Sequence, residues 1–367
     1  MSLLRVAMTL EQCWHRVPGG VAVAALGMAR ALRDTHKIHL TGVAAAHRRP
    51  APPQWTPPVP VRRLSLPRPL LYEAWHRLRA PAVERATGPV DVIHATTMAI
   101  PPRKAPLVVT IHDLAWIANP GHFTPHGVRF FERGLELARR DADLVLCPSA
   151  ATLEDCKEHG FDGGRLRHIP LGVEIRPIDP EDVARVRSGY GLTERYVMWT
   201  GTIEPRKNLP RLLEAFRSIP KPVELILVGP SGWNEDIDQT IGSSELRTRV
   251  RTLGFVPKND LAALYKGASV FCFPSLLEGF GFPILEAMAQ GTPVVTSIGT
   301  STEELAGDAA LLVDPLDPGA IAAGIKRALD MRTATRLSAA GPSRAAEFGW
   351  DKTAVALIDA YREVSRA

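Results

Sequence analysis

Short runs of apolar residues alternate with segments of helical periodicity along the whole chain. The segments 19–33 and 208–219 carry apolar residues at helical spacing, and each follows an apolar run. The runs are almost continuously apolar, which is typical of parallel strands that helices cover on both faces. We therefore expect strands at 4–8, 91–95, 107–113, 144–149, 167–172, 195–201, 224–229, 249–256, 269–275, 293–297 and 309–314.

The strands and helices fall into two series, each large enough for one doubly wound parallel sheet. The chain has 367 residues, a length that favours two domains over a single core. A polar, proline-bearing stretch at 172–186 separates the two series. We expect Rossmann-like α/β domains over 1–178 and 179–347, and an amphipathic helix in the last segment, 348–367.

Positive charge is concentrated near the N-terminus. The net charge is +5, but residues 1–80 hold 12 Lys and Arg against 3 Asp and Glu, so they carry +9 and the rest carries −4. This asymmetry predicts an anionic partner such as lipid headgroups or phosphates. No recognised nucleic-acid-binding module accompanies it, so we expect no nucleic-acid partner.

The sequence also indicates a compartment. No apolar run approaches the roughly 20 residues that span a bilayer, and the N-terminus lacks the apolar region of a signal peptide. The four cysteines are scattered in or near apolar runs, so we expect buried free thiols: Cys13, Cys147, Cys156 and Cys272. A cytoplasmic protein is the expectation.

Residues that directly follow strands are the first candidates for ligand binding, because ligands of doubly wound sheets bind beyond the carboxyl ends of the strands. Gly19 and Gly20 open a helix after the first strand, where backbone amides can meet an anion. A simple strand-to-helix turn is equally compatible. Arg206 and Lys207 follow the strand at 195–201 and suit a pyrophosphate. The alternative for them is a solvated basic turn.

Two carboxylates stand in an apolar, glycine-rich stretch, "EGFGFPILEAMAQGTPVV". Pro283 suits the first turn of a helix and Gly291 its end. Glu278 then begins a tight loop at a helix N-terminus, and Glu286 lies one turn inside the helix. Carboxylates accept hydrogen bonds from neighbouring sugar hydroxyls, so the pair suits one elongated ligand. Alternatively, Glu286 only complements the helix dipole and Glu278 is solvated.

Together these motifs resemble glycosyltransferase family 4, the retaining enzymes of the GT-B fold. Glu278 and Glu286 match the E-x7-E signature of that family. The similarity extends across nearly the whole chain, through "PGG", "TIHDLAW", "PSAATLEDC", "HIPLGVE", "GTIEPRKNLPRLLEAF", "LGFVPKNDLAALYKGA" and "STEELAGDAALLVDP". The resemblance implies two domains that face each other across a cleft, with the last helix crossing back onto the N-terminal domain.

The resemblance also implies roles for individual residues. Glu286 would hold the ribose of the nucleotide. Glu278 and the loop Gly279, Phe280, Gly281 and Phe282 would hold the transferred sugar and phosphate oxygens. Arg206 and Lys207 would neutralise the departing diphosphate, which Gly19 and Gly20 would approach from the other domain. His112 would contact the sugar near its reacting carbon, and Phe255 and Val256 would border the base.

One position departs from the family pattern. Many relatives carry arginine where this chain has Thr202, so the charge falls more heavily on Arg206 and Lys207. The "EPRKN" form resembles O-antigen mannosyltransferases and favours GDP-mannose as the donor, with a glycan or lipid-linked acceptor. We expect no metal cofactor, and interpret the two D-x-D sequences, 141–143 and 236–238, as solvated surface.

Several alternatives stay open. His112 is also compatible with a core histidine that bonds to backbone. The segment 68–86 has Leu71, Trp75 and Leu78 at helical spacing beside basic residues, so it suits either peripheral contact with an anionic membrane or ordinary packing. A GT-B sugar-nucleotide epimerase and an inactive sugar-nucleotide-binding scaffold are the competing functions. A phosphorylase is disfavoured, because no lysine has the context of a pyridoxal site.

Overall fold

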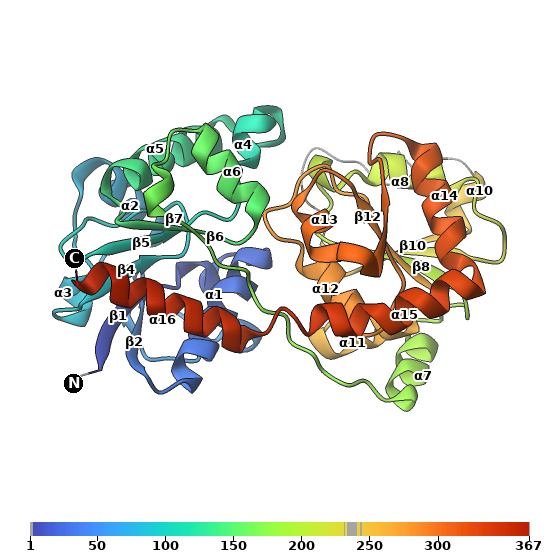
Figure 1. Cartoon of the computed structure of the whole chain (residues 1–367), viewed down its shortest axis with the longest axis horizontal. Coiled ribbons are helices and arrows are strands. Elements are labelled where there is room, and N and C mark those ends of the chain that lie inside the picture. Colours follow the sequence, from blue (N-terminus) through green and yellow to red (C-terminus); the bar gives the residue numbers. More distant parts are fainter. Residues whose placement is uncertain (1–2, 231, 233–240, 243, 367) are drawn as a thin grey trace. The chain divides into compact units, whose positions relative to one another are not determined.

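The computed structural model describes residues 3–230, 232, 241–242 and 244–366. The chain divides into two compact units (Figure 1). Unit 1 comprises Met1–Gly172 and Gly349–Ala367, and unit 2 comprises Val173–Phe348. The first division thus falls six residues before the position expected from the sequence, at the start of the polar stretch.

Unit 1 is built on a parallel sheet of seven strands in the order β3-β2-β1-β4-β5-β6-β7. The strands are β1 (Leu4–Thr9), β2 (Ile38–Ala44), β3 (Val61–Arg63), β4 (Val92–Ala95), β5 (Leu107–Thr110), β6 (Leu144–Cys147) and β7 (Leu166–His168). The direction of winding reverses between β1 and β4, which pair through Val6 and Val92. Strands β2 and β3 are additional to those expected from the sequence.

Helices cover both faces of this sheet (Figure 1). They are η1 (Glu11–Trp14), α1 (Gly19–Asp34), η2 (Pro53–Trp55), α2 (Arg68–Glu73), η3 (Ala74–Leu78), α3 (Glu84–Thr87), α4 (Ala115–Ala118), η4 (Pro120–His122), α5 (Pro125–Asp141), α6 (Ala150–Glu158), η5 (Gly163–Arg165) and α16 (Trp350–Arg366). The last of these, α16, packs on α1 although it follows unit 2 in the sequence. Among the described residues, no helix has the length and apolar character needed to cross a membrane.

Unit 2 contains a parallel sheet of six strands in the order β10-β9-β8-β11-β12-β13. The strands are β8 (Tyr196–Thr200), β9 (Glu224–Val228), β10 (Val250–Gly254), β11 (Val270–Phe273), β12 (Val294–Ser297) and β13 (Ala310–Val313). Its described helices are α7 (Pro180–Gly189), η6 (Pro205–Lys207), α8 (Leu209–Phe216), α10 (Ser244–Arg247), α11 (Lys258–Gly267), α12 (Phe282–Ala289), α13 (Ser301–Ala306), η7 (Gly307–Ala309), α14 (Pro318–Leu329) and α15 (Met331–Ala345). Here the winding reverses between β8 and β11. The expected α/β architecture with two Rossmann-like sheets is confirmed.

The apolar runs form the buried sheet cores. Every residue of β8 and β11 is buried, as the continuous apolar character of both runs requires. All four cysteines are buried free thiols, which confirms that expectation.

The apolar face of the segment 68–86 packs into the core of unit 1. Leu71 is fully buried and Trp75 is 1% exposed, and both belong to the main apolar cluster of this unit. The indole Nε1 of Trp75 donates to the carbonyl of Pro81 at 2.9 Å. For Leu71 and Trp75 the structure therefore favours the alternative of ordinary packing. Leu78 is 76% exposed, so membrane contact through the outer side of the segment stays a prediction.

The first residue of α16 occupies a notch formed by two glycines. A Cβ atom at Gly27 would lie 2.1 Å from the indole of Trp350, and one at Gly172 would lie 2.5 Å from it. Because such contacts are far inside van der Waals distance, only glycine leaves room for this ring. The packing of α16 in unit 1 thus depends on the absence of side chains at Gly27 and Gly172.

We expect Gly27→Ala to lower the free energy of unfolding of unit 1 by about 1–3 kcal/mol, the usual cost of overpacking. The matched control is Gly189→Ala in α7, where a Cβ would meet nothing within 4 Å. The control should be neutral or slightly stabilising, because alanine favours helices. Hydrogen exchange of the amides in α1 and α7 measures the effect in each unit separately. Equal effects of the two substitutions on stability would contradict the requirement for glycine at position 27.

Candidate active site

The reversal between β8 and β11 places the loops that follow them side by side at one edge of the unit 2 sheet. In doubly wound sheets, ligands bind at such a reversal, beyond the carboxyl ends of the strands. Arg206 and Lys207 follow β8, and Glu278 follows β11. Three of the site residues expected from separate motifs therefore come from neighbouring loops.

Backbone and amide contacts hold the two loops together. The amide of Leu276 donates to the carbonyl of Arg206 at 2.8 Å. Asn208 adopts a left-handed conformation with φ of 61°, which turns the chain from η6 into α8. Its side-chain amide donates to the carbonyls of Pro274 at 2.9 Å and Pro315 at 2.7 Å. This anchoring fixes the cations of η6 against the loop after β11.

Two cations and two carboxylates form a cluster at this point, buried except for the partly exposed Arg206. Lys207 Nζ lies 2.5 Å from Glu278 Oε1, and Arg206 Nη1 lies 3.1 Å from Glu278 Oε2. Arg206 Nε pairs with Glu204 Oε1 at 2.5 Å. Lys207 is 7% exposed and Glu278 is 9% exposed. Lys207 Nζ also lies 4.9 Å from the centre of the Phe273 ring, a favourable cation–π contact.

The cluster controls the ionisation of its members. Burial alone would raise the pKa of Glu278, but the neighbouring Lys207 and Arg206 lower that pKa below its ordinary value. Burial lowers the pKa of Lys207 and Arg206 acts in the same direction, with the contact to Glu278 as the main opposing influence. Glu278 is therefore a carboxylate at neutral pH, and its contact favours the charged form of Lys207.

The glycine loop before α12 has the expected form. Gly281 has φ of 120°, a conformation that favours glycine, and Pro283 stands in the first turn of the helix. The hydroxyl of Ser301 donates to the carbonyls of Glu278 at 2.7 Å and Phe280 at 2.9 Å. The side chain of Phe280 is buried, with its ring centre 5.2 Å from that of Phe282. Phe280 can thus offer a ligand its backbone, whereas its ring belongs to the core.

Glu286 lies one turn inside α12, half-buried, apart from the cluster of cations. Its Oε2 accepts a hydrogen bond of 3.0 Å from the hydroxyl of Tyr265. Burial is the main cause that raises the pKa of Glu286, and the Tyr265 hydrogen bond opposes it. After β10, Phe255 is 67% exposed and Val256 is 5% exposed. Of that pair, the Phe255 ring is the one that can stack on a ligand.

The remaining expected residues divide between the units. Thr202 is half-buried in the loop after β8 of unit 2. Gly19 and Gly20 belong to unit 1, where both are exposed at the start of α1. His112, also in unit 1, follows β5 and its Nε2 lies 3.1 Å from the carbonyl oxygen of Thr96. Burial lowers the pKa of His112, and Asp113 opposes that effect.

Several supporting residues were not identified from the sequence. In unit 2 these are Glu204 and Tyr265, which contact Arg206 and Glu286. At the reversal of the unit 1 sheet, Gln12 Nε2 donates to the hydroxyl of Thr96 at 2.8 Å, and both residues are buried. Their position in the sequence could have identified Gln12 and Thr96, because each comes shortly after a buried strand.

The first D-x-D sequence is an ion-paired structure. Asp141 contacts Arg79 at 2.8 Å and Arg140 at 2.6 Å, and Asp143 contacts Arg103 at 2.7 Å. Its interpretation as solvated surface is wrong, because the Asp141 side chain is only 16% exposed. The other sequence, 236–238, lies outside the described residues. Within the described part of the chain, no group of three or more His, Cys, Asp or Glu residues could hold a metal ion.

Comparison with known proteins identifies the family of both units. Residues 18–176 match the family described as "Glycosyltransferase Family 4", and residues 181–344 match "Glycosyl transferases group 1". The chain is 34% identical over 306 residues to O-antigen chain mannosyltransferase B of Escherichia coli, covering 80% of each protein. It is 30% identical to MMP alpha-(1->4)-mannosyltransferase of Mycolicibacterium hassiacum, covering 75% of this chain and 71% of that protein.

Solved structures agree in fold. Alr3699/HepE of Anabaena, crystallised with UDP and glucose, has a TM-score of 0.77 at 23% identity and covers 98% of this chain and 100% of its own. Sucrose-phosphate synthase of Thermosynechococcus elongatus has a TM-score of 0.77 at 24% identity, with 98% of each chain covered. The sequence matches, the two Rossmann-like sheets and these GT-B neighbours agree, and the chain belongs to the family 4 glycosyltransferases of the GT-B fold.

Proposed function

We propose that this glycosyltransferase moves mannose from GDP-mannose to a glycan or lipid-linked acceptor, with retention of the anomeric configuration. The observation that carries the proposal is the buried cluster of Arg206, Lys207 and Glu278 at the sheet reversal. The mannosyltransferase names of the most similar relatives support the choice of sugar.

The cluster suits the departure of a diphosphate. The bond between the anomeric carbon and the phosphate oxygen breaks, and negative charge grows on that oxygen. Arg206, Lys207 and the N-terminus of α12 would stabilise this charge, which is the largest contribution in many enzymes. The acceptor oxygen then bonds to the anomeric carbon, and its proton passes to the departing phosphate.

The ionic contacts of Glu278 bear on the stereochemistry. A carboxylate that attacks the sugar needs a free oxygen, but both oxygens of Glu278 contact cations. Glu278 is thus a poor covalent nucleophile. Retention would instead follow if the acceptor approaches from the face that the diphosphate leaves. Because Arg206 and Lys207 supply positive charge, we further propose that transfer needs no metal.

A UDP-hexose is the second candidate donor, because HepE was crystallised with UDP-glucose. The test incubates the protein with GDP-mannose, UDP-glucose and other sugar nucleotides, with and without EDTA, and measures nucleotide release. We expect GDP release from GDP-mannose, also in EDTA. Release of UDP alone would assign the second donor. Inverted configuration at the anomeric carbon of the product would overturn the proposal, as would the absence of nucleotide release from every donor.

We expect Glu286→Gln to weaken donor binding about 10- to 100-fold, because a charged acceptor of ribose hydroxyls is lost. Turnover at saturating donor should change less, since the ribose is remote from the reacting bond. The matched control is Glu214→Gln, which replaces an exposed glutamate of α8. Isothermal titration calorimetry with the nucleoside diphosphate measures both variants. Unchanged affinity in Glu286→Gln would remove Glu286 from the donor site.

A further inference from the structure

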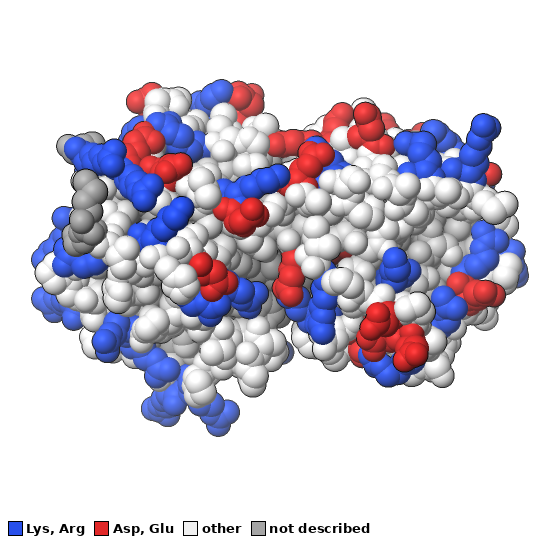
Figure 2. Space-filling view, turned by 60° about the horizontal axis from the view of Figure 1, so that its bottom comes forward, with Lys and Arg blue, Asp and Glu red and all other residues white. Residues whose placement is uncertain are grey.

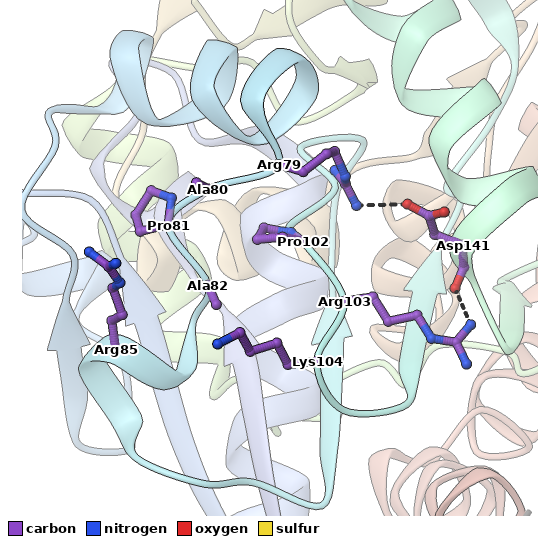
Figure 3. Close-up of a pocket in the computed structure, with 9 residues that line it drawn as sticks. All are labelled: Arg79, Ala80, Pro81, Ala82, Arg85, Pro102, Arg103, Lys104 and Asp141. Carbon is purple, nitrogen blue, oxygen red and sulfur yellow. Dashed lines mark hydrogen bonds and ion pairs between the residues drawn. The ribbon is translucent and has the colours of Figure 1, made fainter.

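Unit 1 contains a cavity with a mainly basic lining. This cavity of about 410 Å³ opens among the segment 79–82, α3, the end of α5 and the segment before β5 (Figure 3). Because that segment precedes its strand, the cavity lies at the opposite edge of the sheet from His112, which follows β5. Its charged lining residues are Arg79, Arg85, Arg103, Lys104 and Asp141.

The nearby carboxylates are already occupied by arginines. Arg79 donates to Asp141 and to the carbonyls of Trp75 and Ile100, each at 2.8 Å. Arg103 donates to the carboxylate of Asp143 at 2.7 Å. These bonds fix Arg79 and Arg103 as rigid parts of the wall.

Arg85 and Lys104 have no such partners. Among the described residues, neither side chain makes a hydrogen bond or ion pair, and both residues are exposed. Figure 3 shows them on the side of the cavity away from Asp141, with Ala82 near the ammonium of Lys104. Figure 2 shows Lys and Arg side chains on the surface of unit 1. The four cations of the cavity wall outnumber its single carboxylate, Asp141, so the cavity would attract an anion.

We propose that this cavity binds a phosphate or diphosphate group. Arginine offers forked hydrogen bonds and lysine a compact charge, a combination that suits phosphate oxygens. The volume lies within the range of small-molecule sites, about 300–1,000 Å³. The group could come from a free phosphorylated molecule or from an anionic lipid headgroup. The exposed Leu78, one residue before Arg79, would suit the lipid.

The test compares two double variants that remove equal charge. Arg85→Gln with Lys104→Gln changes the cavity, and Lys326→Gln with Arg327→Gln changes two exposed residues of α14. Sodium pyrophosphate is titrated by calorimetry. Vesicles of phosphatidylglycerol in phosphatidylcholine are tested by co-sedimentation. Because the side chains of Arg85 and Lys104 make no hydrogen bonds or ion pairs within the described fold, the cavity variant should keep the wild-type melting temperature.

We expect the cavity variant to bind one of the probes at least tenfold more weakly, while the α14 variant binds like the wild type. Weakened pyrophosphate binding assigns a free phosphate compound, and weakened sedimentation assigns a lipid headgroup. Equal weakening in both variants would reduce the effect to general charge and overturn the site, as would wild-type affinity in the cavity variant. A binding step lost with Lys207→Met instead belongs to the candidate active site, so the two proposals fail separately.

Discussion

Replacing Lys207 by methionine is expected to lower the turnover number of sugar transfer about 100- to 1,000-fold. Removal of one well-placed electrostatic contact to a developing negative charge costs roughly that much in other enzymes. Lys207 is 7% exposed beside Arg206, and a charge has its largest effect where water is excluded. Methionine keeps the length and apolar stem of lysine and removes only the charge.

The measurement separates binding from chemistry. Turnover is followed at saturating donor, and donor affinity is measured independently by calorimetry. Lys326→Met serves as the control, because it removes a lysine charge from the exposed surface of α14 in the same unit. If Lys207→Met loses donor affinity but keeps the wild-type turnover number, Lys207 binds the donor and does not assist the departure of the diphosphate.

Most of the fold could be predicted because its strands are buried on both faces. Such strands are almost continuously apolar, and β8 and β11 were recognisable for that reason. β2 was missed because His39, Thr41 and Gly42 interrupt its apolar character, and His39 is exposed. β3 was missed because it is a three-residue edge strand, Val61–Arg63, with two arginines. Edge strands carry little burial signal.

The sequence predicted the candidate ligand-binding residues but not the direct contacts among their side chains. Position after a strand made Arg206 and Lys207 candidates, and the glycine-rich loop and the family signature made Glu278 one. Their contact joins residues 71 and 72 positions apart in the sequence, and it depends on β8 and β11 being neighbours. Glu204 was not predicted, because no local sequence pattern indicates its ion pair with Arg206.

The pairing of Lys207 with Glu278 makes a second large effect testable, this time on stability. We expect Glu278→Leu to lower the stability of unit 2 by about 3–5 kcal/mol, because it leaves the buried Lys207 without its carboxylate partner. Lys207→Met should cost less, because Arg206 still contacts Glu278. The double variant should be more stable than Glu278→Leu, since it leaves no unpaired lysine. An apolar pair of similar size is often as stable as a buried ion pair.

Hydrogen exchange of the amides in β8 and β11 is the suitable measurement, because two units need not unfold together and a single unfolding curve could mix them. Additive costs within about 0.5 kcal/mol would mean that the two residues do not interact. The double variant also tests catalysis, since it should regain stability without regaining transfer. A double variant that is at least as stable as the wild type but inactive would show that the cluster adds nothing to the stability of the fold, and that its charges are needed for the reaction.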